Sequence, residues 1–539
     1  MNTSRRKLKV KIWILILSYA ILTSLPFLVP HLGPLSLIAF VPLFYLEKIC
    51  TDNNIKYAWW YYYAAFLLFN IVSTFWIWFV SAIGCVAALL LNALQMTVIF
   101  ALFHWSRKRL KTKWLSYVFF IITWIAWEHV YFNIELSWPW LVLGNSFATS
   151  TKLVQWYELT GTLGGSLWIL LVNVLIYFLL LPSFERSSRK KKETVAISAA
   201  VLLLIVVPVA GSLCRYSSYR ETEDSIEAVA VQPNIDPFKK YGILPQNQLD
   251  DNLIAQIESV ITPQTRYVIT PETFSYGMVL DNPASSESFR KYKHFLAEHP
   301  GTNLLVGILT YGRYFSTEKP TPSARPNGQF WYDAYNSAVL MDESMVYEYY
   351  HKSKLVPGVE IIPYQQYIPF LGEIVSKFGG SSGSYGTQDD MTVLTGNDGN
   401  KVGAMICYES IYGEYSRRAA KKGATFMAVM TNDGWWGDTP GYRQHFRYAS
   451  LRAIEMRRDV VHVANTGISG HINQRGDVLQ RTQWWVPAVL KMDVNVNSKL
   501  TPFVKYGDIV GLVAAYLFLP ALLAMIVVSI IGKKRKLRS

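Results

Sequence analysis

The chain has 539 residues, of which 51% are hydrophobic and 17% are charged, a balance that excludes one ordinary soluble domain. Its formal net charge is +14 at pH 7. The basic residues form no stripe interleaved with aromatic side chains, which argues against nucleic acid as a partner. They occur in short clusters beside apolar segments, as is typical of membrane proteins. These clusters are residues 5–9, 107–113, 186–192 and 533–538.

Apolar runs of about 17–25 residues are long enough to cross a bilayer as helices. The sequence predicts eight such runs, and the second is the shortest and contains Pro42. The first follows a basic stretch, as a signal peptide does, but it lacks a small-x-small cleavage pattern, so we expect a retained span. The predicted spans are residues 12–29, 34–47, 58–80, 82–104, 115–133, 164–182, 194–213 and 508–531.

The basic loops predict the orientation of these spans, because Lys and Arg collect on the cytoplasmic side of a membrane. The loops after the fourth and sixth spans and the tail after the eighth are the most basic connections. All three lie in the cytoplasm if the N-terminus does, and the C-terminus is then cytoplasmic as well. We therefore expect membrane helices in residues 1–214, a domain outside the cytoplasm in residues 215–507, and a last span with a basic tail in residues 508–539.

The segment between the seventh and eighth spans has the pattern of a globular α/β domain. Short apolar runs alternate there with turns and helical stretches, and strands that alternate with helices predict a layered α/β fold. The predicted strands are residues 225–231, 266–270, 303–309, 337–341, 402–406, 425–430 and 460–464.

Three residues with reactive side chains, Glu272, Lys352 and Cys407, stand at or near strand ends, where α/β sheets display reactive groups. Taken singly, Cys407 is typical of a buried small hydrophobe, Glu272 of a turn and Lys352 of a charged surface. Together they suffice for acyl transfer. A carboxylate can serve as general base for a thiol, and an ammonium favours the thiolate and stabilises an oxyanion.

The other three cysteines, Cys50, Cys85 and Cys214, lie in or beside apolar segments, and no Cys/His spacing indicates a metal site. No disulfide is therefore expected within the globular domain. We expect neither a metal nor another cofactor.

These residues resemble the Glu–Lys–Cys signature of the nitrilase superfamily. Over nearly its full length the chain is similar to the membrane-bound apolipoprotein N-acyltransferases of that superfamily. The resemblance implies eight membrane helices, a four-layer αββα sandwich and the inner membrane of a bacterium, with a periplasmic catalytic domain. The similar segments are Pro271-Glu272, Lys352 with Leu355-Val356-Pro357, Cys407-Tyr408-Glu409, Trp138-Pro139-Trp140, Gly144-Asn145-Ser146, Gln232-Pro233-Asn234-Ile235, residues 431–437, residues 465–469 and Tyr506-Gly507-Asp508.

The resemblance also implies a two-step reaction. Cys407 accepts an acyl chain from a phospholipid, and the chain then passes to the N-terminal amine of a diacylglyceryl-cysteine in a lipoprotein. Glu272 is the implied base and Lys352 the partner of the thiolate and oxyanion. The implied supporting and substrate-contacting residues are Glu360, Glu409, Tyr408, Tyr241 and Trp435.

Two departures from the family pattern concern contacts with substrate. Val359 precedes Glu360 where Phe-Gly-Glu is common, and Tyr241 replaces a frequent Trp. The aromatic-rich residues 361–378 are a candidate lid over the site, and the alternative for this segment is an insert that packs in the core.

Two other functions fit parts of the sequence. A membrane-anchored nitrilase-like amidase would use water as the acceptor. A transporter or scaffold would need no chemistry, and Glu128 and His129 are the residues in the spans that come closest to an ion path.

Overall fold

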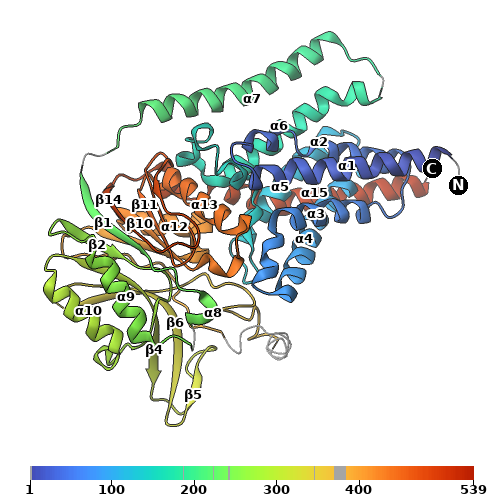
Figure 1. Ribbon diagram of the computed structural model, residues 1–539. Coiled ribbons are helices and arrows are strands. Elements are labelled where there is room, and N and C mark those ends of the chain that lie inside the picture. The colour runs from blue at the N-terminus through green and yellow to red at the C-terminus, as the bar shows by residue number, and fades with distance from the viewer. Residues whose placement is uncertain are drawn as a thin grey trace. The chain divides into compact units, whose positions relative to one another are not determined.

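The computed structural model describes residues 3–185, 187–221, 224–240, 243–344, 346–368 and 384–538, and the chain divides into two compact units (Figure 1). The helical unit comprises Met1–Phe75, Cys85–Ser218 and Asp508–Ser539. The α/β unit comprises Trp76–Gly84 and Tyr219–Gly507.

Seven helices among the described residues are long and apolar enough to cross a membrane, and they coincide with seven of the eight predicted spans. The fifth predicted span is present as helix α5, which is not one of these seven and carries Glu128 and His129. The helices of this part of the chain are α1 (Thr3–Leu28), η1 (Gly33–Leu37), α2 (Val41–Asp52), α3 (Trp59–Thr74), η2 (Phe75–Phe79), α4 (Ala82–Arg109), α5 (Trp114–Tyr131), η3 (Pro139–Leu141), η4 (Leu143–Phe147), η5 (Thr151–Leu153), α6 (Tyr157–Glu185), α7 (Lys191–Ser218) and α15 (Ile509–Arg538).

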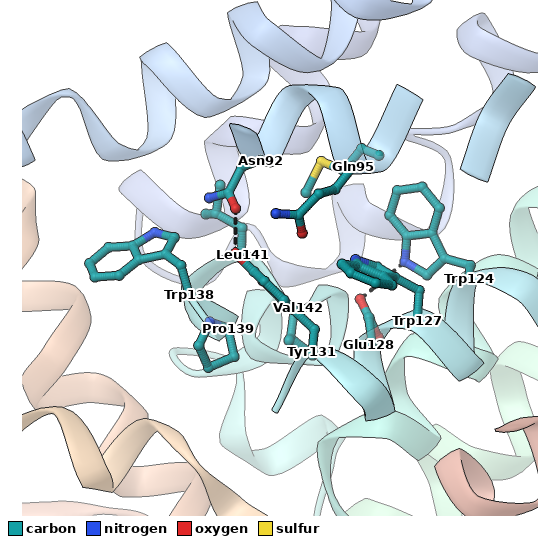
Figure 2. A pocket seen from close by; sticks show the side chains of 11 residues that line it. Asn92, Gln95, Trp124, Trp127, Glu128, Tyr131, Trp138, Pro139, Leu141 and Val142 are labelled. Atoms are coloured by element: carbon teal, nitrogen blue, oxygen red, sulfur yellow. Dashed lines mark hydrogen bonds between the residues drawn. The ribbon is translucent and has the colours of Figure 1, made fainter. Parts of the chain in front are cut away.

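A pocket in the helical unit lies between α4, α5 and the segment that follows α5 (Figure 2). Glu128 at its border accepts hydrogen bonds from Trp124 Nε1 and from the backbone N–H of Leu143, both at 3.0 Å. The neighbouring His129 Nδ1 lies 2.8 Å from Asp508 Oδ2 at the start of α15. Both polar residues singled out in the sequence therefore join separate segments of the helical unit.

The first sheet of the α/β unit is formed in the described residues by eight strands in the order β14-β1-β2-β4-β6-β5, with β3 beside β4 and β7 beside β6. β1, β2 and β4 are parallel, and β6 is antiparallel to β4 and to β7. The strands are β1 (Ser225–Gln232), β2 (Thr265–Ile269), β3 (Ser275–Val279), β4 (Asn303–Tyr314), β5 (Arg325–Asn327), β6 (Phe330–Met341), β7 (Tyr347–His351) and β14 (Ala488–Asn495).

The second sheet has the order β13-β12-β11-β10-β9-β8 in the same part of the chain. Its centre is the parallel set β9, β10 and β11, whose almost wholly buried residues explain the continuous apolar runs in the sequence. The strands are β8 (Leu394–Thr395), β9 (Lys401–Ile406), β10 (Phe426–Thr431), β11 (Val460–Ala464), β12 (Gly470–Ile472) and β13 (Val478–Arg481).

Helices cover the outer face of each sheet, so the unit is the expected four-layer sandwich (Figure 1). On α9, Leu249, Leu253 and Ile257 recur every fourth residue and bury one face against the first sheet. The second sheet is covered by α12 and α13. The helices are α8 (Pro237–Lys240), α9 (Gln246–Glu258), η6 (Pro283–Ser285), α10 (Glu287–Glu298), η7 (Cys407–Ile411), α12 (Gly413–Lys421), η8 (Asp433–Trp436), α13 (Pro440–Met456) and α14 (Pro502–Tyr506).

The α/β unit contains one segment that is distant in the sequence. Residues 76–84 connect α3 to α4, yet they group with the sheets. The buried Trp76 donates a hydrogen bond from Nε1 to Gln444 Oε1 at 3.2 Å. A Cβ on Gly441 would lie 2.6 Å from the Trp76 ring, so α13 accepts this indole because a glycine stands there.

Candidate active site

Glu272, Lys352 and Cys407 follow β2, β7 and β9 respectively. β2 and β7 run in the same direction within the first sheet, so Glu272 and Lys352 emerge at the same edge. The buried Lys352 Nζ lies 2.9 Å from Glu272 Oε1 and 2.9 Å from Glu360 Oε2. The ammonium therefore bridges two carboxylates. Burial alone would lower the pKa of Lys352, but Glu272 and Glu360 outweigh it and hold that pKa well above its usual value.

Asn336 is a fourth member of this cluster that the sequence analysis missed. Its side-chain Nδ2 donates to Glu272 Oε1 at 2.8 Å and to Glu360 Oε1 at 3.0 Å. Its backbone oxygen accepts from the N–H of Lys352 at 2.8 Å. One asparagine thus fixes both carboxylates and the lysine backbone. The signal available in the sequence was a polar amide directly before the apolar run of β6, because a polar side chain in the interior needs hydrogen-bond partners.

Glu409 connects the lysine segment to the cysteine segment. Its carboxylate accepts from the backbone N–H groups of Ser353 and Ile406, both at 2.8 Å, and from the hydroxyl of Tyr350. Burial raises the pKa of Glu409 to about 7, against the effect of these donors. Glu409 therefore joins the residue that follows Lys352 to the residue that precedes Cys407.

Cys407 is the first residue of η7, directly after β9; its backbone φ is left-handed, at 51°, and the residue is partly buried. Desolvation raises the pKa of Cys407 well above its usual value, Glu272 raises it further, and Lys352 lowers it. Lys352 thus favours the thiolate, as the sequence analysis expects of an ammonium, but burial and the Glu272 carboxylate outweigh its effect on this pKa. A neutral thiol beside a carboxylate suits general-base activation instead.

The remaining predicted residues have varied surroundings. Tyr408 is buried and packs edge-on against Tyr412. Trp435 is half-buried, and its ring lies 5.1 Å from that of Phe238. Tyr241 lies outside the described residues, as do positions 369–378 of the candidate lid.

Lys354 is clearly separated from the lysine that bridges the carboxylates. Its Nζ lies 5.4 Å from the centre of the Tyr412 ring and 5.7 Å from that of Tyr415. Burial lowers its pKa. The Lys354 ammonium therefore makes cation–π contacts, and Glu409 is the acid that acts on its pKa.

Lys240 is a second buried amine near the site that the sequence analysis did not identify. Its Nζ donates to the backbone oxygen of Thr273, the residue after Glu272. Burial lowers the pKa of Lys240 to about 7, against the attraction of Glu272 and Asp250. This lysine can therefore hold the turn that carries Glu272 while remaining largely uncharged above neutral pH.

One group in the described part of the chain has the residue types of a metal site, namely Asp433, His445 and His462, whose candidate ligand atoms lie within 4.8 Å of one another. All three residues are buried. The Asp433 and His445 atoms already face each other at hydrogen-bond distance, with Nδ1 3.0 Å from Oδ1. A direct hydrogen bond therefore accounts for this contact.

Comparison with known proteins now defines the class. Residues 230–499 match the carbon-nitrogen hydrolase family, and residues 19–175 match the apolipoprotein N-acyltransferase N-terminal domain. The chain belongs to the carbon-nitrogen hydrolase family.

Within that family, the chain resembles the apolipoprotein N-acyltransferases over most of its length. The Chlorobaculum tepidum enzyme of that name is 29% identical over 489 residues, which is 89% of each chain. The Thermotoga maritima enzyme is 26% identical over 402 residues, or 74% of this chain and 68% of the relative. A nitrilase-superfamily structure from Saccharomyces cerevisiae covers 51% of this chain and 92% of its own, with 15% identity and a TM-score of 0.36.

Proposed function

We propose that the chain transfers an acyl group from a membrane phospholipid, through a thioester on Cys407, to the N-terminal amine of a diacylated lipoprotein. The chain is an acyltransferase of the apolipoprotein N-acyltransferase type. The observation that carries the residue assignment is the Lys352 ammonium held between Glu272 and Glu360, since Lys352 and Glu272 both act on the pKa of Cys407.

The first half-reaction forms the thioester. Glu272 removes the thiol proton as Cys407 sulfur attacks the ester carbonyl of the phospholipid. Lys352 stabilises the oxyanion of the tetrahedral intermediate. As the ester C–O bond breaks, the protonated Glu272 returns its proton to the departing oxygen. The products are an acylated cysteine and a lysophospholipid.

The second half-reaction consumes the thioester. The neutral amine of the acceptor attacks the thioester carbonyl, and Glu272 removes one proton from the nitrogen. The C–S bond breaks as the amide forms, and the sulfur recovers the proton. Lys352 again stabilises the oxyanion. The same three residues therefore carry out both half-reactions, and each proton that Glu272 takes up is passed on within the same half-reaction.

A thioester can be trapped when the amine acceptor is withheld. Purified protein incubated with phospholipid alone is expected to gain the mass of one acyl chain. Hydroxylamine should remove that mass, and Cys407→Ala should never acquire it. Intact-protein mass spectrometry makes the measurement. An acyl adduct of unchanged yield in Cys407→Ala would refute the assignment, and release of free fatty acid without N-acylation of an added lipopeptide would favour the amidase.

We also propose that both termini are cytoplasmic and that the α/β unit lies on the periplasmic side of the inner membrane, as the basic loops suggest. Gln248 and Lys190 are exposed and provide test positions. In a background lacking the reactive Cys407 and the exposed Cys214, Gln248→Cys should react with an impermeant maleimide applied from the periplasmic side, and Lys190→Cys should not. Labelling of only Lys190→Cys would reverse the orientation.

A further inference from the structure

Helix α13 begins beside a piece of chain that connects two predicted membrane spans. Residues 76–84 join the third span to the fourth, yet they belong to the α/β unit. Within that unit the Trp76 ring packs against Gly441 and donates a hydrogen bond to Gln444. A connection between two spans lies at the bilayer surface. We therefore expect the start of α13 to lie near lipid headgroups.

Three arginines gather at this end of α13. Arg443 and Arg447 are one helical turn apart, so they lie on the same side of the helix. Arg481 ends β13 and pairs with Gly470 on β12. A Cβ on Gly470 would lie 2.8 Å from the ring of Phe446, so α13 passes this point of the sheet directly before Arg447. Residues distant in the sequence thus bring three positive charges together.

The three positive charges are only partly balanced. Arg443 forms an ion pair with the exposed Asp438 at 2.7 Å. Burial lowers the pKa of Arg447, and the charges of Arg481 and Arg443 lower it further, with no acid acting in the other direction. Neither Arg447 nor Arg481 forms an ion pair within the described part of the chain. The cluster therefore has a surplus of positive charge, which attracts an anion.

An aromatic and apolar segment lies beside the arginines. The Trp484 ring stacks on that of Tyr442, with centres 4.0 Å apart. The guanidinium of Arg443 lies 5.1 Å from the centre of the same Tyr442 ring. The next two residues, Trp485 and Val486, are exposed. Tryptophan and tyrosine collect at the boundary between lipid and water, where arginine can reach the headgroups.

Hydrogen bonds to the backbone hold this exposed segment in place. The side-chain amide of Gln232 donates to the carbonyl oxygens of Gln483 and Val486, at 2.9 and 2.8 Å. The N–H of Trp485 donates to the oxygen of Thr466 at 3.3 Å. The backbone φ of Trp485 is left-handed, at 59°, which a bulky residue keeps only where its surroundings hold it. The fold thus presents an exposed indole from a strained and fixed backbone.

We propose that Arg443, Arg447 and Arg481 bind the phosphate groups of lipids, while Trp485 and Val486 enter the apolar layer below them. The occupant is the surface of the bilayer that holds the spans on either side of residues 76–84. A guanidinium suits this partner because its planar fork can bind a phosphate through two parallel hydrogen bonds. The site holds the α/β unit on lipid, and it goes beyond the proposed acyl transfer, on whose chemistry it does not depend.

The test measures contact between position 486 and lipid in the full chain. Val486→Cys, in a background with Cys407→Ala and Cys214→Ser, is labelled with a nitrobenzoxadiazole fluorophore. The protein is placed in nanodiscs of phosphatidylcholine, alone or with an equal part of phosphatidylglycerol, in which some acyl chains carry a nitroxide quencher. Lipid should quench the probe in both, and more strongly with phosphatidylglycerol. The same probe on Gln248→Cys, an exposed position on α9, should not be quenched.

Replacing the arginines tests their part in this contact. The combined Arg443→Gln, Arg447→Gln and Arg481→Gln variant should shift the equilibrium away from lipid contact by about 10²-fold in the phosphatidylglycerol discs. Each basic residue near an anionic surface strengthens binding by about fivefold, and high salt should weaken the contact by screening. A matched control removes the same charge from exposed positions elsewhere in the α/β unit and should leave the quenching unchanged: Arg266→Gln, Arg290→Gln and Lys293→Gln. If the combined variant does not fold, Arg481→Gln alone should give the fivefold shift.

Three results would overturn the inference. Lipid could quench the probe at position 486 no more than the probe on α9. Quenching could be equal in the arginine variant and its control, which would mean that the arginines do not bind lipid. Energy transfer between two labelled copies in one disc, without quenching by lipid, would identify a second copy as the occupant. Because the background lacks the Cys407 thiol, none of these results depends on a thioester, whose absence would be seen by mass spectrometry instead.

Discussion

Lys352→Met is expected to lower the rate of thioester formation by at least about 10²–10³-fold, because it removes an ammonium that stabilises the oxyanion. It also leaves Glu272 and Glu360 as facing carboxylates with Asn336 as their shared neutral partner. Removing one member of a buried ion pair typically costs about 3–5 kcal/mol. The thermal unfolding temperature should therefore fall together with the activity.

Lys354→Met is the matched control for this variant, since it makes the same change two residues away. Its ammonium lies against the rings of Tyr412 and Tyr415, and a methionine can retain much of that packing. The acylation rate should stay within about tenfold of the wild type, since the cation–π contact of this partly buried lysine, worth about 1–2 kcal/mol, contributes to stability and not to the reacting groups. Both rates can be followed by intact-protein mass with phospholipid in excess. A large loss of acylation rate in Lys354→Met, together with a normal rate in Lys352→Met, would refute the assignment of Lys352 as the oxyanion partner.

Glu272→Gln is expected to change acylation and alkylation in opposite directions. Without its general base, acyl transfer should fall by about 10²–10⁴-fold. The same substitution removes a negative charge that raises the pKa of Cys407, so that pKa should fall. The thiolate then forms at lower pH, and iodoacetamide should alkylate Cys407 faster than in the wild type at pH 8.

The pH dependence of alkylation in the wild type provides the baseline. Since the pKa of Cys407 is raised, the rate should still be rising at pH 9, the region in which an ordinary cysteine approaches its plateau. Glu360→Gln is a suitable control, because it changes a carboxylate on the same lysine that is not recorded as acting on the thiol. A wild-type plateau below pH 7, or no shift in Glu272→Gln, would contradict this description of the site.

The predictable part of the fold was its buried centre. All seven predicted strands are present, because β1, β2, β4, β6, β9, β10 and β11 contain continuous apolar runs. The predicted bounds of β4 and β6 were too short, because the ends of these strands are partly exposed and less apolar. β4 continues to Tyr314 and β6 begins at Phe330, in a long hairpin whose tip contains both polar and aromatic residues. The short strands β3, β5 and β7 carry too few apolar residues to be recognised.

The candidate site was predictable only in its reactive residues. Sequence spacing could not separate Lys352 from Lys354, because both lie on the same side of an extended segment. The structure separates them where β7 ends at His351 and Glu409 accepts hydrogen bonds from the next backbone segment. Asn336 and His445 were missed because each lies in an element that looks like ordinary core. Asn336 contacts residues 24 and 64 positions away, and His445 contacts Ser410 and the carbonyl oxygen of Cys407, 35 and 38 positions away.

Residues 76–84 make the α/β unit discontinuous along the chain. The ribosome produces Trp76 more than a hundred residues before α13, on which its indole packs beside Gly441 and Gln444. The two parts of the α/β unit are separated by residues 85–218, which must be synthesised before Trp76 can pack against α13. Residues 219–507 expressed alone would lack the buried Trp76 side chain that packs against α13. In evolutionary terms, the α/β unit could not be moved to another protein as one continuous stretch of sequence without losing residues 76–84.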